Sequence, residues 1–333
     1  MAEEDTARIA VIGAGLAGLL CARRLQDAGL HPVVFEKSRG LGGRLATRRA
    51  EDNRAFDHGA QYITARSPGF RALLESARQA GSADLWRPRL APGTDGRGED
   101  WMVGAPAMNA LVRPLAEGLD IRQQSQVTAL RRAPGGWCLE GLDDEAGRPF
   151  DAVVCAVPAP QAQTLAAEEA ALAEHLAAVR IAPCWALMVT FSGAFDAGFD
   201  ACRPDGEAPA WIARNASKPG RAANRDTWVV HAGPEWSGEN LELEREEAAA
   251  RIAALLPVAF GRNLPPIDHA VAHRWRYALT TAPLGRPYLA SADRSLLIGG
   301  DWCLGARVEC AYESGDAMAA ALLERFGLER LDR

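Results

Sequence analysis

Lysine is almost absent from this sequence, and positive charge is not in excess. Only Lys37 and Lys218 are lysines, and 43 acidic residues outnumber 37 basic ones to give a net charge of −6. Because nucleic-acid binding needs a basic surface, we expect no nucleic-acid partner. No apolar run approaches the roughly 20 residues of a membrane span, and the acidic start "MAEEDTARIAVIG" does not resemble a secretion signal. We therefore predict a cytoplasmic protein without membrane attachment.

Paired cysteines are missing too. The seven cysteines are scattered and none forms a Cys-x-x-Cys pair, which argues against a zinc site and a disulfide framework and favours buried, reduced thiols. The six histidines are dispersed, so no metal site and no Ser-His-Asp triad is predicted. His231 and His273 lie on strand-like stretches, where we expect core residues.

The sequence does contain a nucleotide-binding pattern near its start. Residues 8–12 predict a buried strand, residues 16–28 a helix, and a second strand ends at Glu36. Strand, turn, helix and strand in this order are the setting in which Gly-x-Gly-x-x-Gly binds a dinucleotide.

The residues of this turn have separate tasks. Gly13 permits the tight turn, Gly15 lets the backbone approach a pyrophosphate, and Gly18 allows the helix to pack on the strand. The helix begins at Leu16 and Ala17, and its first N–H groups and positive dipole end attract phosphate.

An acid at the end of the second strand completes the pattern. Glu36 follows Gly13 by 23 positions, where its carboxylate can accept hydrogen bonds from the ribose of adenosine, and Lys37 comes next. The carboxylate would repel a 2′-phosphate, so NADP is not expected in this site. The pattern leaves open whether the dinucleotide carries nicotinamide or flavin.

A second glycine segment favours a flavin dinucleotide over a nicotinamide dinucleotide. "SRGLGGRLATRR" places Gly42, Gly43 and Arg44 a few residues after Glu36, where the arginine can meet phosphate oxygens. This arrangement resembles the second fingerprint of FAD enzymes of the amine-oxidase kind.

Two further stretches resemble the same flavoproteins. "FDHGAQYI" resembles the loop beside the isoalloxazine ring, with Gly59, Ala60 and Gln61 nearest. Val127 of "SQVTAL" matches the position whose backbone contacts the adenine.

The C-terminal "LLIGGDWCLGARVECAYESG" resembles the Gly-Asp segment of this group. The resemblance implies that Asp301, after Gly300, holds a ribityl hydroxyl. A helix starting near Val308–Glu309, preceded by Arg307, would aim its N-terminus at the N1–C2=O edge of the flavin and favour the reduced state. Non-covalently bound FAD is the cofactor that these resemblances imply.

The predicted fold class is α/β, with a Rossmann-like FAD-binding domain, similar to amine oxidases and p-hydroxybenzoate hydroxylase, and an inserted α+β substrate domain. We assign residues 1–60, 104–158 and 286–333 to the first domain and 61–103 and 159–285 to the second. Residues 119–157 predict a small antiparallel meander that returns to the main sheet. Helices are expected near 160–178 and 241–256.

A narrower resemblance covers nearly the whole chain. "FDHGAQYITAR", "WIARNASKPGR", "DTWVVHAGPEWS", "HRWRYA" and "GDWCLGARVE" resemble the bacterial renalases. The resemblance implies an oxidase that takes a hydride from 1,2- or 1,6-dihydro isomers of NAD(P)H onto FAD, releases NAD(P)+ and uses O2 to form H2O2. Aromatisation of the dihydropyridine drives this reaction, so no general base is needed, and placement against flavin N5 is the main requirement.

Flat aromatic walls and an amide could hold a nicotinamide ring. The candidates for this pocket are Tyr62, Trp211, Arg214, Asn215, Trp275 and Tyr277. For each of them a place in the core or a solvated surface is an equal alternative. Lys218, Arg221 and Arg225 could attract phosphates, but we expect them in a solvated loop.

Three alternatives stay open. An amine oxidase shares the FAD fingerprints, although "RWRYALTTAPLGRPYL" lacks a cysteine that could anchor the flavin. A desaturase or porphyrinogen-oxidising enzyme also shares them, although no membrane-docking stretch is evident. A flavin-binding sensor without turnover is the alternative from another class.

Overall fold

A computed structural model describes residues 7–52, 54–96, 98–142, 149–193, 195–222 and 226–328. The chain divides into two compact units. The first consists of Met1–Gly43, Val112–Arg180 and Thr280–Arg333, and the second of Arg44–Leu111 and Ile181–Leu279.

The first unit is built on a six-stranded sheet in the order β16-β17-β10-β1-β2-β7. Its strands are β1 (Arg8–Ile12), β2 (His31–Glu36), β7 (Asp120–Gln123), β10 (Ala152–Cys155), β16 (Tyr288–Ala290) and β17 (Leu296–Gly299). All neighbouring strands are parallel except β16 and β17. Every residue of β10 and β17 is buried, as expected for parallel strands covered on both faces.

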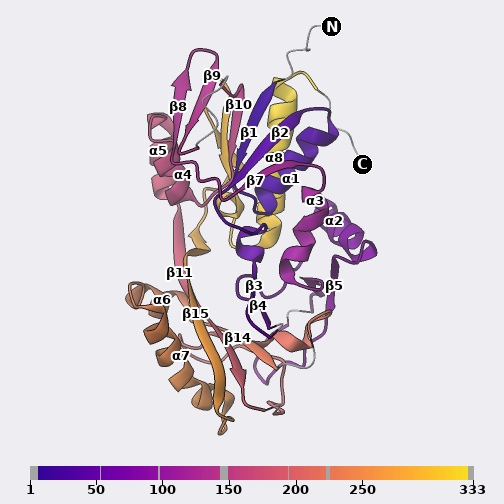
Figure 1. The fold of residues 1–333 in the computed structure, drawn as a ribbon, viewed down its shortest axis with the longest axis vertical. Coiled ribbons are helices and arrows are strands. Elements are labelled where there is room, and N and C mark those ends of the chain that lie inside the picture. Colours follow the sequence, from indigo (N-terminus) through magenta and orange to yellow (C-terminus); the bar gives the residue numbers. More distant parts are fainter. Residues whose placement is uncertain are drawn as a thin grey trace. The chain divides into compact units, whose positions relative to one another are not determined.

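Helices α1 (Leu16–Asp27) and α8 (Val308–Arg325) pack closely beside this sheet (Figure 1). Gly315 of α8 makes the approach possible, since a Cβ there would lie 2.4 Å from the carbonyl oxygen of Ala17. The remaining helices of the unit are α3 (Arg113–Ala116), α4 (Ala159–Leu165) and α5 (Ala170–Ala178). The predicted α/β class with a Rossmann-like domain, and its first strand, helix and second strand, are confirmed.

The predicted meander over residues 119–157 is wrong in its pairing. Within the described residues of this range, β8 (Ala129–Ala133) and β9 (Gly136–Glu140) form an antiparallel hairpin, and Trp137 of β9 forms an antiparallel bridge with Phe150. β7 pairs in parallel with β2, and β10 with β1. β10 is buried throughout and β7 is mostly exposed, and in neither strand does so short a run reveal the direction of its partner. The single helix expected near 160–178 is divided into α4 and α5.

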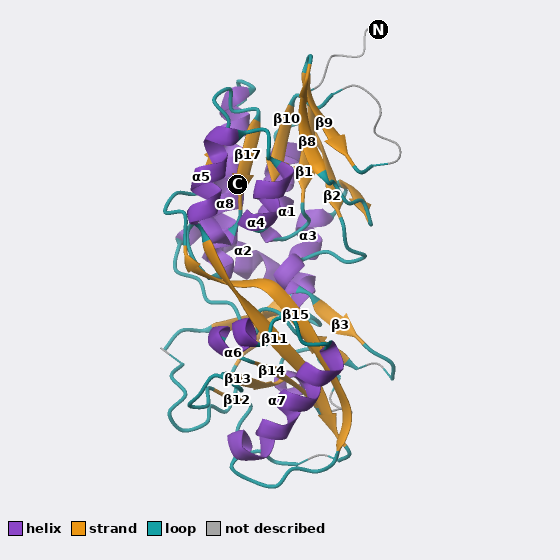
Figure 2. Ribbon diagram, turned by 90° about the vertical axis from the view of Figure 1, so that its left-hand side faces the viewer, coloured by secondary structure: helices purple, strands orange, loops and turns teal. Residues whose placement is uncertain are grey.

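The second unit contains a five-stranded sheet in the order β12-β13-β14-β11-β15. Its strands are β11 (Arg180–Phe191), β12 (Ala201–Cys202), β13 (Trp211–Arg214), β14 (Thr227–His231) and β15 (Ile267–Ala282). Figure 2 shows α7 (Arg245–Phe260) along these strands, and Trp185, Trp228 and Phe260 belong to the core between them. The other elements are the hairpins β3 (Thr47–Arg49)–β4 (Ala55–Asp57) and β5 (Ala83–Trp86)–β6 (Trp101–Gly104), with α2 (Pro68–Gln79) and α6 (Pro234–Glu239).

The boundaries of the units differ from those expected from the sequence. Residues 44–60 and 104–111 fold with the second unit, and residues 159–180 and 280–285 with the first. One reason is that the backbone N–H of Met108 donates to Thr47 Oγ1 at 3.0 Å and to Asp57 Oδ1 at 3.1 Å. These bonds join residues 104–111 to residues 44–60, the two segments that the sequence had assigned to the first domain.

Among the residues that the structure describes, no helix has the length and hydropathy of a membrane span. All seven cysteines are free thiols, five of them buried.

Replacing Gly315 with alanine should lower the free energy of unfolding by about 1–3 kcal/mol, because the new methyl group overlaps the backbone of α1. Gly238→Ala is the matched control, since a Cβ at Gly238 in α6 meets nothing within 4 Å. Urea denaturation of both variants measures the difference, and equal stabilities would contradict the packing described here.

Candidate functional site

The first unit carries a glycine turn at the end of β1. Gly13 has φ +102°, and a Cβ on Gly18 would lie 2.0 Å from the carbonyl oxygen of Gly13. A Cβ on Gly15, by contrast, would meet nothing within 4 Å. The turn is therefore packed tightly at Gly18, whereas the space beside Gly15 is open. α1 begins there, at Leu16.

The carboxylate of Glu36 lies directly beside this turn. Glu36 is buried, and its oxygens accept hydrogen bonds from the backbone N–H groups of Ala14 at 2.9 Å and Ser38 at 2.8 Å. Two backbone donors thus hold the side chain in one orientation at the end of β2. The neighbouring Lys37 is exposed.

The second glycine segment packs onto the first. Gly42 donates to the carbonyl of Ala14 at 2.8 Å and forms a bridge with Gly15. Gly43 has φ +54°, and a Cβ there would come within 3.5 Å of Gly15 Cα. The first unit therefore has backbone without side chains on both sides of the open space above Gly15.

The Gly-Asp segment also lies in the first unit. Gly300 has φ +154° and ψ −177°, a conformation that favours glycine, and its N–H donates to Ser314 Oγ at 2.9 Å. The buried Asp301 opens the 3-10 helix η4 (Asp301–Cys303). α8 begins at Val308 as predicted, and Arg307 contacts the buried Glu309 at 2.6 Å.

These features fit a dinucleotide. The open backbone over Gly15 and the start of α1 suit a pyrophosphate, and the fixed Glu36 carboxylate suits ribose hydroxyls. Val127 is buried in the connection between β7 and β8, and its contact with the adenine stays a prediction.

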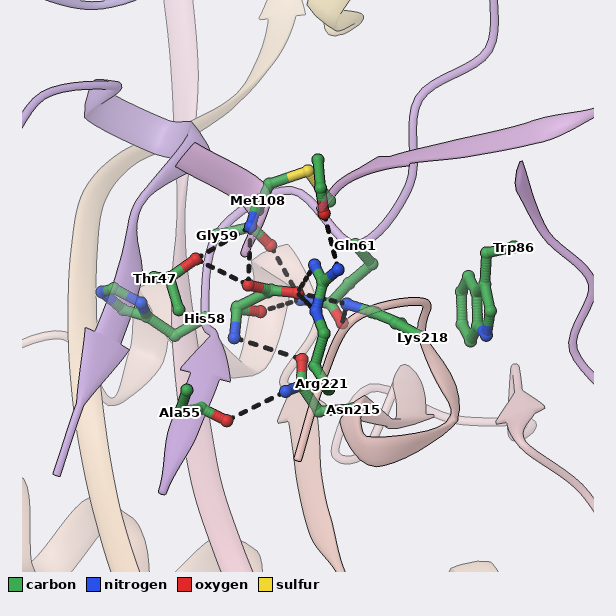
Figure 3. Close-up of polar contacts among 12 residues, drawn as sticks. Thr47, Ala55, His58, Gly59, Gln61, Trp86, Met108, Asn215, Lys218 and Arg221 are labelled. Carbon is green, nitrogen blue, oxygen red and sulfur yellow. Dashed lines mark hydrogen bonds and ion pairs between the residues drawn. The ribbon is translucent and has the colours of Figure 1, made fainter. Parts of the chain in front are cut away.

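In the second unit, a buried carboxylate accepts hydrogen bonds from four residues on three segments of the chain (Figure 3). Asp57 Oδ1 accepts from Thr47 Oγ1 at 2.6 Å and from the N–H of Met108. Asp57 Oδ2 accepts from Lys218 Nζ at 3.3 Å and from Arg221 Nη2 at 2.5 Å. The side chains of the three charged residues are at most 2% exposed.

The predicted solvated loop around Lys218 and Arg221 is therefore wrong. Both side chains point inward, because Asp57 offers a buried negative charge that a Gly- and Pro-rich stretch alone does not reveal. Arg225 lies outside the described residues.

Burial and charge shift two pKa values in this cluster. Burial raises the pKa of Asp57, but Lys218, Arg221 and the Thr47 hydroxyl outweigh it and lower the pKa to about 2. Burial lowers the pKa of Lys218 to about 8, with Arg221 adding to the effect and Asp57 opposing it. The Asp57 carboxylate is thus ionised at neutral pH.

Lys218 reaches the turn that follows Asp57. Its Nζ donates to Gln61 Oε1 at 3.2 Å, and Gln61 Nε2 donates to the carbonyls of Asp57 at 2.5 Å and Gly59 at 3.0 Å. A Cβ on Gly59 would lie 2.0 Å from the carbonyl oxygen of Arg44, which accepts from Ala60 N at 2.9 Å. Residues 57–61 therefore form a closed turn, to which we refer as the Asp57–Gln61 turn.

The expected carboxamide contact of Asn215 conflicts with its surroundings. Asn215 is fully buried, its Nδ2 donates to the carbonyl of Ala55 at 2.9 Å, and its Oδ1 accepts from Asp57 N at 3.2 Å. Both the nitrogen and the oxygen of the Asn215 amide are therefore hydrogen-bonded to backbone groups at or near Asp57 and are not free for a carboxamide. Arg214 is likewise engaged, donating to Asp226 at 2.7 Å.

The aromatic candidates fall into two groups within the second unit. Tyr62 stacks on Trp101 with 4.0 Å between ring centroids, and Trp211 lies 5.7 Å from Tyr62. Trp275 stacks on His58 at 5.0 Å and donates to its carbonyl at 3.0 Å. Tyr277, two residues further along β15, is half-buried.

Three histidines near the Asp57–Gln61 turn are held neutral. Burial lowers the pKa values of His58, His231 and His273 to about 4. His231 Nε2 lies 3.1 Å from the carbonyl of His58, and His273 packs edge-on against His58.

Sequence reasoning missed Asp57, Trp101 and the inward direction of Lys218. Asp57 stands inside the quoted "FDHGAQYI", so its place next to the expected flavin loop was the available signal. Within the described part of the chain, no group of acidic, histidine or cysteine side chains has a metal-binding arrangement.

Comparison with known proteins places this chain in a family. A model of the NAD(P)-binding Rossmann-like domain matches residues 11–77, and the model of the flavin containing amine oxidoreductases matches residues 77–323. The chain belongs to the flavin containing amine oxidoreductase family. By its description, that family consists of flavin containing oxidoreductases.

Individual relatives match over shorter stretches. Renalase of Mus musculus is 27% identical over 164 residues, which cover 46% of this chain and 48% of renalase. The 15-cis-phytoene desaturase of Synechococcus elongatus is 40% identical over 68 residues, 20% of this chain and 14% of the desaturase. The matches therefore span less than half of these curated relatives.

Two solved structures share the fold over nearly their whole length. A putative protoporphyrinogen oxidase from Exiguobacterium has a TM-score of 0.76 at 14% identity, covering 96% of this chain and 99% of its own. Cyclohexylamine oxidase from Brevibacterium oxydans has a TM-score of 0.75 at 12% identity, covering 97% and 100%. Identities this low support the fold and no shared activity.

The neutral histidines predict a loss of stability in acid. Between pH 6.5 and 4 these histidines are protonated in the unfolded chain but stay neutral in the folded protein. As the pH is lowered through this range, the free energy of unfolding therefore falls by up to about 1.4 kcal/mol per pH unit for each such group. Urea midpoints at pH 7 and pH 5 measure this fall. His231→Gln should reduce it while the exposed His31→Gln leaves it unchanged, and an equal fall in all three proteins would refute the assignment.

Proposed function

We propose that this protein is an FAD-dependent oxidase of the 1,2- or 1,6-dihydro isomers of NAD(P)H, with O2 as electron acceptor and NAD(P)+ and H2O2 as products. The observation that carries the proposal is the extent of the similarity to renalase. That match covers 46% of the chain, whereas the match to the phytoene desaturase covers 20% and that to an amine oxidase of Oncorhynchus mykiss 24%. The free thiols support a reducing compartment such as the cytoplasm.

FAD is the flavin that the first unit suits best. Glu36 would accept from the adenosine ribose, the backbone around Gly15 would receive the pyrophosphate, and Asp301 would hold a ribityl hydroxyl. Non-covalent binding is supported by Cys303, the first of the two cysteines in the Gly-Asp segment, since burial raises the pKa of its thiol to about 12 and leaves little thiolate.

The chain's own residues have a limited chemical task in this reaction. Bound FAD would supply the hydride acceptor, and aromatisation of the substrate would drive the transfer. The protein must then orient a flat dihydropyridine and exclude water, tasks for which the half-buried Tyr62 and Trp275 are the proposed walls. Neither task needs a proton acceptor, which agrees with His58 and His231, whose lowered pKa values make them weak bases.

Amine oxidation is the competing activity, because amine oxidases are among the curated relatives. Anaerobic titration of the FAD-loaded protein separates the two. Dihydro-NAD isomers should bleach the visible flavin band rapidly, while NADH and simple amines should act slowly or leave it unchanged. Bleaching by amines alone would replace this proposal with amine oxidation, and a flavin band that no donor bleaches would indicate a binding protein without turnover.

Glu36→Ala should weaken FAD binding at least tenfold, because it removes the ribose acceptor and leaves the N–H groups of Ala14 and Ser38 without their buried partner. Ultrafiltration of bound from free FAD measures the affinity. Glu117→Ala, at an exposed position of the same unit, is the control. Equal FAD affinities of the two variants would remove Glu36 from the cofactor site.

A further inference from the structure

The buried cluster around Asp57 contains more positive than negative charge. Among the described residues, Asp57 is the one carboxylate that contacts either Lys218 or Arg221. One carboxylate therefore faces two cations whose side chains are 0% and 2% exposed. When all three are ionised, the cluster holds a surplus charge of +1 away from water.

Arg221 alone would neutralise Asp57. Its Nε and Nη2 both donate to Asp57 Oδ2, at 3.2 and 2.5 Å, and its Nη1 donates to the carbonyls of Gly104 and Pro219. Arg221 thus balances the charge of Asp57 and also binds two backbone carbonyls, those of Gly104 and Pro219. Burying a second cation costs free energy that this pairing does not return, so stability does not explain the presence of Lys218.

The contacts of Lys218 point toward the Asp57–Gln61 turn. Lysine can only donate, so the amide oxygen of Gln61 must face Nζ and its nitrogen must face the carbonyls of Asp57 and Gly59. Nζ also lies 5.4 Å from the centre of the Trp86 ring, which bears no charge. The ammonium therefore sets the orientation of Gln61 and places its surplus charge against the inner side of the turn.

We propose that Lys218 is a positioning residue whose buried charge stabilises negative charge on the group bound against the Asp57–Gln61 turn. The inference rests on the proposed function, in which this turn adjoins the flavin ring. A reduced flavin is anionic and an oxidised one is neutral, so a buried cation behind the turn favours the reduced form. Lys218 acts through Gln61 and through its field.

The test compares FAD-loaded wild-type protein with Lys218→Met. The variant should bind sulfite, which forms an anionic adduct with flavin, about tenfold more weakly. Its two-electron midpoint potential should fall correspondingly, by about 30 mV for a tenfold change. Its thermal midpoint at saturating FAD should be no lower than that of the wild type, because Asp57 and Arg221 remain as a balanced pair.

Two further variants separate charge from structure. Lys218→Arg keeps the charge and should stay within about twofold of wild-type sulfite affinity, and Arg87→Met removes an exposed cation of the same unit and should change nothing. Wild-type potential and sulfite affinity in Lys218→Met would overturn the inference while leaving the proposed function intact. A large loss of stability in Lys218→Met would also overturn it, by making the lysine a structural residue. Failure of wild-type protein to bind FAD would instead overturn the proposed function, and this inference with it.

Discussion

The buried carboxylate of Asp57 holds together the candidate site of the second unit. Thr47 on β3, the backbone of Met108, and the side chains of Lys218 and Arg221 all donate to its two oxygens. Burying a carboxylate is costly unless such donors surround it, and Thr47, Met108 and Arg221 supply them even without Lys218. Segments far apart in the chain therefore meet there. The Asp57–Gln61 turn begins at this residue, so the hydrogen bonds that hold Asp57 also hold the start of the turn.

The first unit depends on a steric constraint instead. Close approach of backbone to backbone at Gly13 and Gly18 leaves no room for side chains, whereas a Cβ on Gly15 would meet nothing within 4 Å. Glu36 then adds one fixed carboxylate to an otherwise uncharged backbone surface. One unit thus offers N–H groups and an acceptor for a nucleotide, and the other a turn with a cation behind it.

The elements predicted correctly are those whose geometry is local. The glycine turn, α1 and the start of α8 follow from neighbouring residues, and sequence analysis placed each of them. The direction of β7 and β10 was missed because it depends on strands elsewhere in the sheet. The burial of Lys218 was missed for a similar reason, since its partner Asp57 lies 161 positions away. Asn215 is buried by the same distant segment, through Ala55 and Asp57.

The most direct test of the account is the product balance of the aerobic reaction. Purified protein supplied with a single 1,2- or 1,6-dihydro isomer of NAD(P)H should release NAD(P)+ and H2O2 in equal amounts, many times in excess of the enzyme. Production of H2O2 from an amine, with none from any dihydronicotinamide isomer, would contradict it.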